Sequence, residues 1–222
     1  MDAARPASAG APLLFLSLAV LLATAQLFWP HVLIKGAFCP ALAVSLWLWR
    51  GSDRTAGRIG LALLLSAAGD VFLAVDRTGL FVHGLASFLA AHLVYLWHFA
   101  ACRPRPFGLD LGRQLLVSAL LGFVAFMLWV LVPRLGALTL PVCLYILAIT
   151  LMGVAAIALR GRPLVILGAL SFILSDSLIA LDKFVAPLEF AGPAIWITYA
   201  LAQLLITLGW RQDAAPLRPP RP

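Results

Sequence analysis

The chain has 222 residues, of which 63% are hydrophobic and 11% charged, and its mean hydropathy is +1.03. This composition leaves too little polar surface for a water-soluble globular protein and is typical of a protein built from membrane-crossing helices. The formal net charge of +7 does not indicate binding to nucleic acid, because the basic residues lie between apolar segments. There they determine topology and contact anionic lipid headgroups.

Charged, glycine and proline clusters divide the sequence into eight apolar segments, each close to the ~20 residues that cross ~30 Å of hydrocarbon as a helix. The predicted spans are residues 11–29, 32–49, 59–75, 80–101, 114–132, 137–158, 164–181 and 193–210. We therefore predict an all-α, polytopic membrane protein that forms a single domain over residues 1–222. Short cytoplasmic tails are expected at 1–10 and 212–222, and the proline-rich end, 214–222, is expected to be disordered.

The first span has an alternative interpretation. Arg5, the apolar run 13–22 and the small residues Ala23-Thr24-Ala25 together resemble a cleavable signal peptide. Cleavage would leave seven helices and place the new N-terminus on the outer face. Because proteins with many spans usually retain their first helix, we expect eight.

Basic residues are distributed unequally between the two sides of the predicted membrane. Twelve of the 16 fall on one side, namely Arg5, Arg50, Arg54, Arg58, Arg103, Arg105, Arg113, Arg160, Arg162, Arg211, Arg218 and Arg221. The other side has Arg77, Arg134 and Lys183, and Lys35 lies inside a span. The positive-inside rule then places both termini in the cytoplasm. The excess of arginine over lysine suits a GC-rich bacterial genome, and in a bacterium the protein would reside in the inner membrane.

Two predicted helices carry an aspartate inside an apolar run. Asp70 follows Ser66-Ala67-Ala68-Gly69, and Asp176 ends the stretch 168–176. A carboxylate at the centre of a bilayer costs roughly 2.5–3.5 kcal/mol on insertion scales, so such a residue is a functional candidate by default. Outside these two helices, no acidic residue lies within a predicted span.

The two aspartate helices also suggest an internal repeat. Residues 70–76 match residues 176–182 at a constant offset of 106, which predicts two parallel four-helix repeats with the site between them. A chance resemblance of two leucine-rich helices is the alternative. Asp76 and Asp182 would be solvated at the outer ends of their helices, and Asp70 and Asp176 would lie about 9 Å deeper.

Other polar side chains lie in the spans at compatible depths. Lys35 is a candidate counter-ion for one buried carboxylate, although its side chain could instead extend to the interface. Residues that could border a cavity with the aspartates are His92, Tyr95, Tyr145, Tyr199 and Gln203, with Ser66 and Ser175 behind them. The alternative is that these groups form hydrogen bonds between helices, each contributing about 1 kcal/mol or less.

Several other chemistries fit poorly. The four histidines do not have the HExxH spacing of zinc hydrolases, and Cys39, Cys102 and Cys143 form neither a CxxC motif nor a paired framework. No GxSxG motif or glycine-rich nucleotide motif follows a strand. We therefore expect no metal, no cofactor and no disulfide.

Five sequence blocks together resemble the YhhN-like lysoplasmalogenase family. They are residues 66–70, 81–84 with Phe88, 92–95, 168–172 with Ser175 and Asp176, and 199–203. Residues 141–145 with Met152, and Lys35 with Pro40, are similar to the signatures of its sixth and second helices. Gly36 follows Lys35 where the family has a Lys-Pro pair. The resemblance covers nearly the whole chain after the first helix.

This resemblance implies hydrolysis of the vinyl ether bond of a lysoplasmalogen, releasing a fatty aldehyde and a glycerophospho-headgroup, with Asp70 and Asp176 as the acid–base pair. Protonation of the vinyl ether needs one neutral carboxyl, and the resulting cation is stabilised by an ionised one. We expect Asp70 to be the acid and Asp176 the base, with Lys35 orienting Asp176 or binding phosphate. The implied partners are a lysophospholipid substrate and membrane lipids, and the oligomeric state leaves no signal.

A different class of function uses the same residues. Parallel repeats with buried Asp and Lys side chains are also typical of a small proton-coupled transporter or a lipid translocator. A transporter would leave its substrate intact, whereas a hydrolase would release free aldehyde. A purely structural or sensor bundle would tolerate replacement of both aspartates with no loss beyond stability.

Overall fold

The computed structural model describes residues 10–51, 53–103 and 108–211. Every long regular element in this part of the chain is an α-helix, and eight helices are long and apolar enough to cross a membrane, as predicted. They are α1 (Gly10–Phe28), α2 (Val32–Arg50), α3 (Arg54–Val75), α4 (Phe81–Cys102), α5 (Leu111–Leu131), α6 (Thr139–Ile157), α7 (Pro163–Phe184) and α8 (Ala191–Arg211). The tails predicted at 1–10 and 212–222, and the disorder predicted for 214–222, lie outside the described residues except for Gly10, which begins α1.

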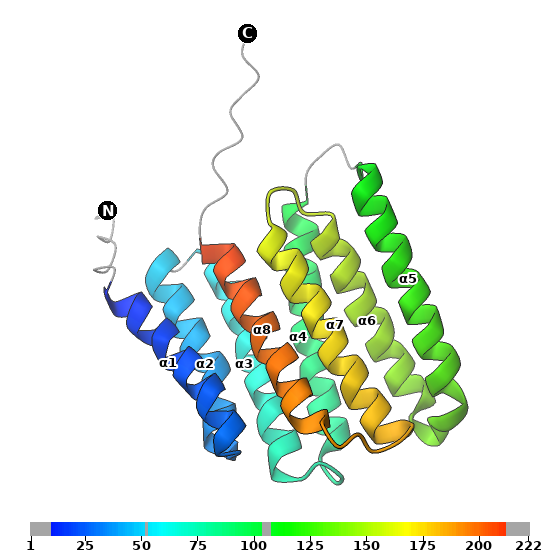
Figure 1. Cartoon of the computed structure of the whole chain (residues 1–222). Helices are drawn as coiled ribbons and strands as arrows, with labels where there is room; N and C mark the ends of the chain where they lie inside the picture. Colours follow the sequence, from blue (N-terminus) through cyan, green and yellow to red (C-terminus); the bar gives the residue numbers. More distant parts are fainter. Residues whose placement is uncertain (1–9, 52, 104–107, 212–222) are drawn as a thin grey trace.

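Six of the helices form a closed ring. Each helix of the ring contacts the next in the order α2, α3, α4, α6, α7, α8, and α8 contacts α2. Outside the ring, α1 packs against α2 and α5 packs against α6. In Figure 1 these two outer helices lie at opposite edges of the bundle. This order is the one expected from the predicted duplication, which pairs α6, α7 and α8 with α2, α3 and α4. The duplication itself remains a prediction.

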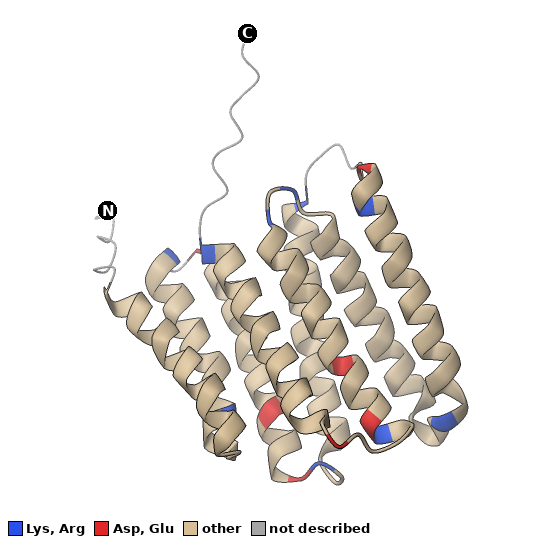
Figure 2. Cartoon of the chain, viewed as in Figure 1, with Lys and Arg blue, Asp and Glu red and all other residues tan. Residues whose placement is uncertain are grey.

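The described chain begins and ends at the same end of the bundle, here called the terminal end (Figure 1). Helices α3 and α7 both run from the terminal end to the opposite, far end. Acidic residues inside the bundle lie on these two helices (Figure 2). Asp70 is five residues before the end of α3 at Val75, and Asp176 is eight residues before the end of α7 at Phe184. They therefore lie about 7.5 Å and about 12 Å from the far ends of their helices.

Helix ends differ from the predicted spans where arginines are accommodated inside a helix. The third span was expected to begin at residue 59, but α3 begins at Arg54. Asp53 caps this helix, because its side chain accepts a hydrogen bond from the backbone N–H of Ala56 at 2.6 Å. The guanidinium of Arg58 lies 3.9 Å from the centre of the Trp97 ring. Such stacking keeps a charged head near the interface while the helix continues.

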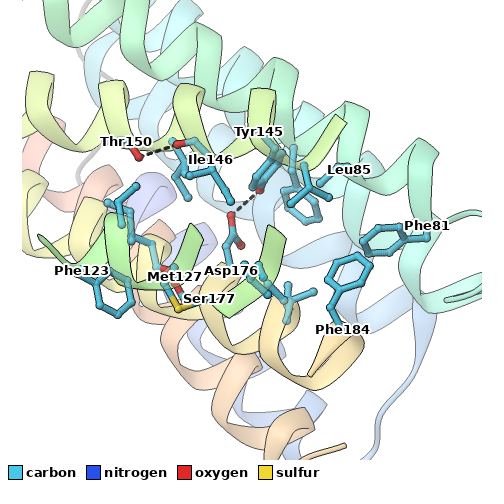
Figure 3. A pocket seen from close by; sticks show the side chains of 18 of the residues that line it. Phe81, Leu85, Phe123, Met127, Tyr145, Ile146, Thr150, Asp176, Ser177 and Phe184 are labelled. Carbon is cyan, nitrogen blue, oxygen red and sulfur yellow. Dashed lines mark hydrogen bonds between the residues drawn. The ribbon is translucent and has the colours of Figure 1, made fainter. Parts of the chain in front are cut away.

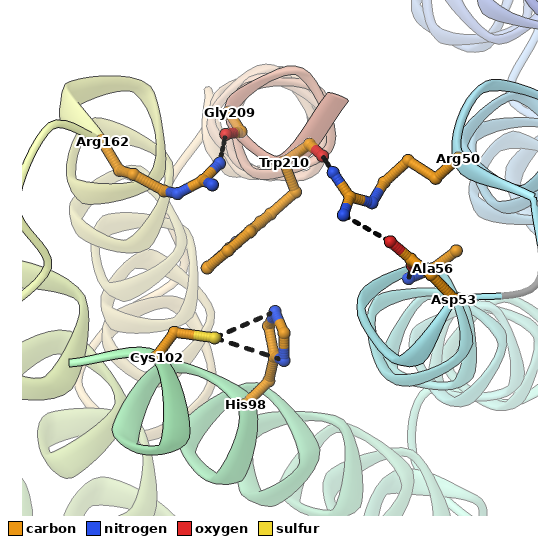
Figure 4. A network of polar contacts seen from close by, with 8 residues as sticks. All are labelled: Arg50, Asp53, Ala56, His98, Cys102, Arg162, Gly209 and Trp210. Carbon is orange, nitrogen blue, oxygen red and sulfur yellow. Dashed lines mark hydrogen bonds and ion pairs between the residues drawn. The ribbon is translucent and has the colours of Figure 1, made fainter. Parts of the chain in front are cut away.

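At the terminal end, polar contacts join the end of α8 to its neighbours (Figure 4). Arg50 donates to the carbonyl of Trp210 at 3.0 Å and forms an ion pair with Asp53. Arg162 donates to the carbonyl of Gly209, and its guanidinium lies 4.0 Å from the Trp210 ring. These contacts satisfy carbonyls that α8 leaves without intrahelical partners, and they connect α8 to α2, α3 and the loop before α7.

Asp76 and Asp182, both expected to be solvated, have different environments. Asp76 is exposed and accepts hydrogen bonds from the backbone N–H groups of Gly79 and Thr78, which lower its pKa. Asp182 is not solvated as expected. Its side chain is 11% exposed, pairs with Arg77 at 2.6 Å and accepts a hydrogen bond from the backbone of Leu188. The reason is that α7 continues to Phe184, which places Asp182 beside the α3–α4 loop.

Candidate active site

Asp70 lies on α3 with a side chain only 2% exposed. Lys35 of α2 places its ammonium 3.5 Å from Oδ1 of this aspartate, and the hydroxyl of Tyr199 on α8 donates to Oδ2 at 2.6 Å. The Tyr199 oxygen is also 3.1 Å from Sγ of Cys39. Lys35 is therefore a counter-ion, as one of its two interpretations expected, and its partner is Asp70 and not Asp176. A charged hydrogen-bond donor and a neutral one together offset much of the cost of a buried carboxylate.

Asp176 lies on α7 and is more open, with its side chain 13% exposed. The hydroxyl of Tyr145 on α6 donates to Oδ2 at 2.5 Å, and Nε2 of His92 on α4 is 3.2 Å from the same oxygen. The His92 nitrogen is also 2.9 Å from the Tyr145 oxygen. No hydrogen bond or ion pair reaches Oδ1 of Asp176 from the described residues. One carboxyl oxygen therefore has two protein partners, and the other has none among them.

The two aspartates are contacted from equivalent positions in the ring. Side chains from α2 and α8 contact Asp70, and side chains from α6 and α4, the paired helices, contact Asp176. Each carboxylate accepts a hydrogen bond from one tyrosine. The remaining partner differs, since Asp70 has an ammonium group and Asp176 has an imidazole. The two tyrosines come from α8 and α6, which the predicted duplication does not pair. The carboxyl groups are therefore contacted from paired helices, but by different groups and with different local charge.

Both aspartates border one cavity, here called the polar cavity, which encloses about 990 Å³ including the part open to the surroundings. It is lined by Gln26, Leu27, Pro30, Lys35, Asp70, Leu73, Arg77, Phe88, Ser175, Asp176, Ile179, Gly192, Pro193, Ile195, Trp196 and Tyr199. The charged residues gather on α2, on α3 and the loop after it, and on α7. A ligand in this cavity can therefore reach both carboxyl groups.

A second cavity, here called the apolar cavity, lies on the other side of Asp176 and encloses about 750 Å³ (Figure 3). Its walls come from α3 to α7, and nearly all of the side chains on them are aliphatic or aromatic. Asp176 borders both cavities, as do Leu73, Phe88 and Ile179. The carboxyl of Asp176 is therefore at the junction between a polar compartment and an apolar one.

Comparison with known proteins identifies the family to which the chain is related. Residues 30–210 match the YhhN family. Bovine lysoplasmalogenase TMEM86A is 38% identical over 73% of this chain and 69% of its own, and human lysoplasmalogenase TMEM86B is 36% identical over 86% and 80%. A lysoplasmalogenase of Mycobacterium bovis is 36% identical over 81% of this chain and 71% of its own. The chain belongs to the YhhN family. No solved structure matches it.

Membership of the YhhN family, together with the eight apolar helices, makes the chain an integral, multi-pass membrane protein. The YhhN resemblance noted from the sequence blocks is thereby confirmed. In the described part of the chain, no group of three or more His, Cys, Asp or Glu side chains is placed to hold a metal ion.

Not every predicted site residue of this YhhN protein borders a cavity. The hydroxyl of Tyr95 donates to Oε1 of Gln203 at 2.7 Å, and both residues are buried away from the two cavities. His92 is fully buried and contacts Asp176 from behind the cavity walls. A direct contact of these three residues with substrate remains a prediction that their positions do not favour.

The two serines expected behind the aspartates also differ from each other. Ser175 borders the polar cavity and donates to the carbonyl of Ile195 at 3.1 Å, which joins α7 to the start of α8. Ser66 is fully buried one turn before Asp70, and its hydroxyl has no hydrogen-bond partner among the described residues.

Sequence reasoning missed Arg77, which borders the polar cavity beside its ion pair with Asp182. A usable signal was present, because Arg77 is one of three basic residues on the sparsely charged side of the predicted membrane. The apolar cavity was also missed. Its wall on α5 is formed by Phe123, Val124, Met127 and Leu131, which no polar motif distinguishes from other lipid-facing residues.

Proposed function

We propose that this YhhN protein is a lysoplasmalogenase, which hydrolyses the vinyl ether bond of a 1-alkenyl lysophospholipid to a fatty aldehyde and a glycerophospho-headgroup. The relatives that carry the name lysoplasmalogenase support the reaction class. The observation that carries the mechanism is that a buried aspartate and a half-buried one, on different helices, border one cavity. A lysophospholipid in the membrane is the corresponding substrate.

The reaction needs acid chemistry on carbon. A proton added to the β-carbon of the vinyl ether leaves an oxocarbenium ion at the carbon bonded to oxygen. Water attacks that carbon and loses a proton, and the hemiacetal so formed breaks its bond to the glycerol oxygen, which takes up a proton. One water molecule is consumed, and no redox step occurs. A neutral carboxyl and an ionised carboxylate can supply all of these proton transfers.

Contacts of the two carboxyl groups favour Asp176 as the acid and Asp70 as the base, the reverse of the expectation from sequence. The ammonium of Lys35 beside Asp70 favours the ionised form of that carboxyl. No Lys or Arg side chain of the described residues pairs with Asp176, and its Oδ1 has no hydrogen bond within the same residues, so this oxygen is free to present a proton to a ligand.

Tyr145 and His92 are positioned to hold Asp176 in one orientation. Both contact Oδ2, which directs the opposite oxygen away from them. When Asp176 gives up its proton, a hydrogen bond from Tyr145 and one from the Nε2–H tautomer of His92 stabilise the carboxylate that forms. Asp70 is held differently, because Tyr199 contacts its Oδ2 and Lys35 its Oδ1, so each oxygen has one partner.

The orientation in the membrane follows from charge. Arginines are concentrated at the terminal end of the bundle, so the positive-inside rule places that end, and both termini, in the cytoplasm. The aspartates then lie nearer to the outer face. In a bacterium, the same topology places the protein in the inner membrane.

The test is an assay of purified protein with a lysoplasmalogen, an alkyl-ether lysophospholipid and an acyl-ester lysophospholipid. Only the first should release aldehyde, because protonation of a saturated ether or an ester gives no oxocarbenium ion of this kind. In D₂O the aldehyde should carry one deuterium at C2. Asp70→Asn and Asp176→Asn should each lower the rate by about 10²-fold or more, while Glu189→Gln, at an exposed loop position, should not.

Two alternatives have distinct outcomes in the same experiment. A proton-coupled transporter or lipid translocator would move the lysolipid between leaflets without releasing aldehyde. A structural bundle would show neither activity. Folded aspartate variants that retain near-wild-type aldehyde release would refute the proposed pair.

A further inference from the structure

Apart from Asp176, the side chains of the apolar cavity have no hydrogen-bond donor left for a polar ligand. Its hydroxyl groups belong to Tyr145, Thr150 and Ser177. Tyr145 donates to Asp176, Thr150 to the carbonyl of Ile146 at 2.6 Å, and Ser177 to the carbonyl of Ile173 at 2.7 Å. Apart from Asp176, the remaining walls are aliphatic, aromatic or thioether groups. Only a hydrocarbon occupant gains free energy in such a space.

Asp176 lies between the two ends of this cavity (Figure 3). Phe81 and Phe184 pack edge to face at the far end, with ring centres 5.9 Å apart, and Nζ of Lys183 lies 4.1 Å from the Phe81 ring. This aromatic contact narrows the far end. Phe123 borders the opposite end of the cavity, here called the inner end because it lies deeper along the helices. Its side chain is 37% exposed on the outer surface of α5. The cavity therefore reaches the lipid-facing surface beside Phe123.

The inner end extends beyond the reacting position. Thr150 is five residues from Tyr145 along α6, which corresponds to about 7.5 Å along the helix axis. Thr150 is 7% exposed, and Val124 of α5 is half-buried and borders the same space. A hydrocarbon chain whose first carbons lie at Asp176 and whose headgroup lies in the polar cavity would thus run toward Thr150 and Val124.

We propose that the apolar cavity binds the hydrocarbon chain of the lysolipid, and that Thr150 and Val124 determine how long a chain is accepted. This inference rests on the proposed function, because it takes the vinyl ether to lie at the junction of the two cavities. Four residues border both cavities, so a single molecule can occupy them together. The phosphate would then lie on the side of Lys35 and Arg77.

Thr150→Phe and Val124→Phe fill the inner end from two different helices and leave the contacts of both aspartates unchanged. Each should lower kcat/KM for an octadecenyl lysoplasmalogen about tenfold relative to a decenyl one, which is the scale on which a hydrophobic pocket discriminates chain length. Leu151→Phe is the matched control, because Leu151 neighbours Thr150 but is 45% exposed and borders neither cavity. It should leave the ratio unchanged.

A binding measurement separates this proposal from the proposed function. Dissociation constants are measured for the non-cleavable octadecyl and decyl ether lysophospholipids with wild type and the same variants. Weaker binding of the octadecyl compound alone supports the chain site, even if wild type releases no aldehyde from any lysoplasmalogen. Equal losses for both chain lengths in folded variants, or no loss in either, would overturn it. Two variants on separate helices keep the test decisive if one fails to fold.

Discussion

The ammonium group of Lys35 lies 3.5 Å from Oδ1 of Asp70, and this is the pair that makes the two aspartates chemically different. Asp176 has a tyrosine and a histidine at the equivalent positions. The two carboxyl groups each have two side-chain partners, but their local charge differs. Such a difference is what acid–base catalysis by two identical side chains requires.

Replacing Lys35 tests this difference directly. Lys35→Met leaves the carboxyl of Asp70 buried without its cation, and we expect a loss of about 3 kcal/mol in the free energy of unfolding together with a large loss of aldehyde release. The double variant Lys35→Met/Asp70→Asn should be more stable than Lys35→Met alone, since it removes the unpaired charge. A double-mutant cycle from unfolding in detergent measures the coupling, and strictly additive losses would contradict the pairing.

Tyrosine variants separate residues at the reacting carboxyl from residues that join helices. Tyr145→Phe removes the hydrogen bond to Asp176 and should lower kcat about tenfold or more through misorientation of the acid. Tyr95→Phe removes the bond to Gln203 and should cost about 1 kcal/mol of stability with a smaller change in kcat. Both are measured by steady-state kinetics and thermal unfolding. A larger kcat loss for Tyr95→Phe would place the substrate near Gln203 instead.

Close approach of α7 and α8 predicts a stability effect with no change in chemistry. A Cβ atom on Gly168 would lie 2.9 Å from the carbonyl oxygen of Ala202 and 2.8 Å from Cγ1 of Ile206. Gly168→Ala should therefore destabilise the protein by about 1–3 kcal/mol. Gly122→Ala, on the outer helix α5, meets no atom within 4 Å and should be neutral or stabilising by up to about 1 kcal/mol. Thermal unfolding of both variants makes the comparison.

Asp53, at the terminal end, predicts a dependence of stability on pH. Burial raises its pKa, but hydrogen bonds from Arg50 and the backbone of Ala56 outweigh this and leave the pKa below its usual value. A carboxyl whose pKa is lower in the folded state than in the unfolded state stabilises the protein at pH values above the unfolded-state pKa of about 3.9. This stabilisation is lost as the pH falls through the folded-state pKa. Asp53→Ala should cost about 1 kcal/mol at neutral pH. The difference in unfolding free energy between this variant and wild type should shrink below about pH 4. A difference that stays constant down to about pH 2 would contradict the lowered pKa of Asp53.

The helices could be predicted because membrane spans leave a strong signal in a single sequence. All eight were expected, and the errors are at their ends. The predicted third span omits the first turn of α3, which contains Arg54 and Arg58, because charged residues were taken to end a span. The hydropathy pattern does not show that the Trp97 ring accommodates the guanidinium of Arg58. Likewise, α7 continues past Asp182 because Arg77 supplies a partner from another part of the chain.

Site residues could be predicted by the cost of burying them, but their partners could not. The depth of Lys35 suits either carboxylate, and only the packing of α2 against α3 brings it to Asp70. Helical spacing places Tyr95 and His92 on similar faces of α4, yet one contacts Gln203 and the other Asp176. The apolar cavity is space left unfilled by ordinary apolar side chains, and such a space has no signature in residue type.

Phe123 borders the apolar cavity and is also exposed on the outside of the bundle. A substrate that enters there comes from the acyl-chain region of the surrounding leaflet and does not pass through water. The rate should then follow the mole fraction of lysolipid in the bilayer. Dilution with an inert phospholipid would slow turnover even at a constant bulk substrate concentration, so the enzyme would respond to the composition of its own membrane.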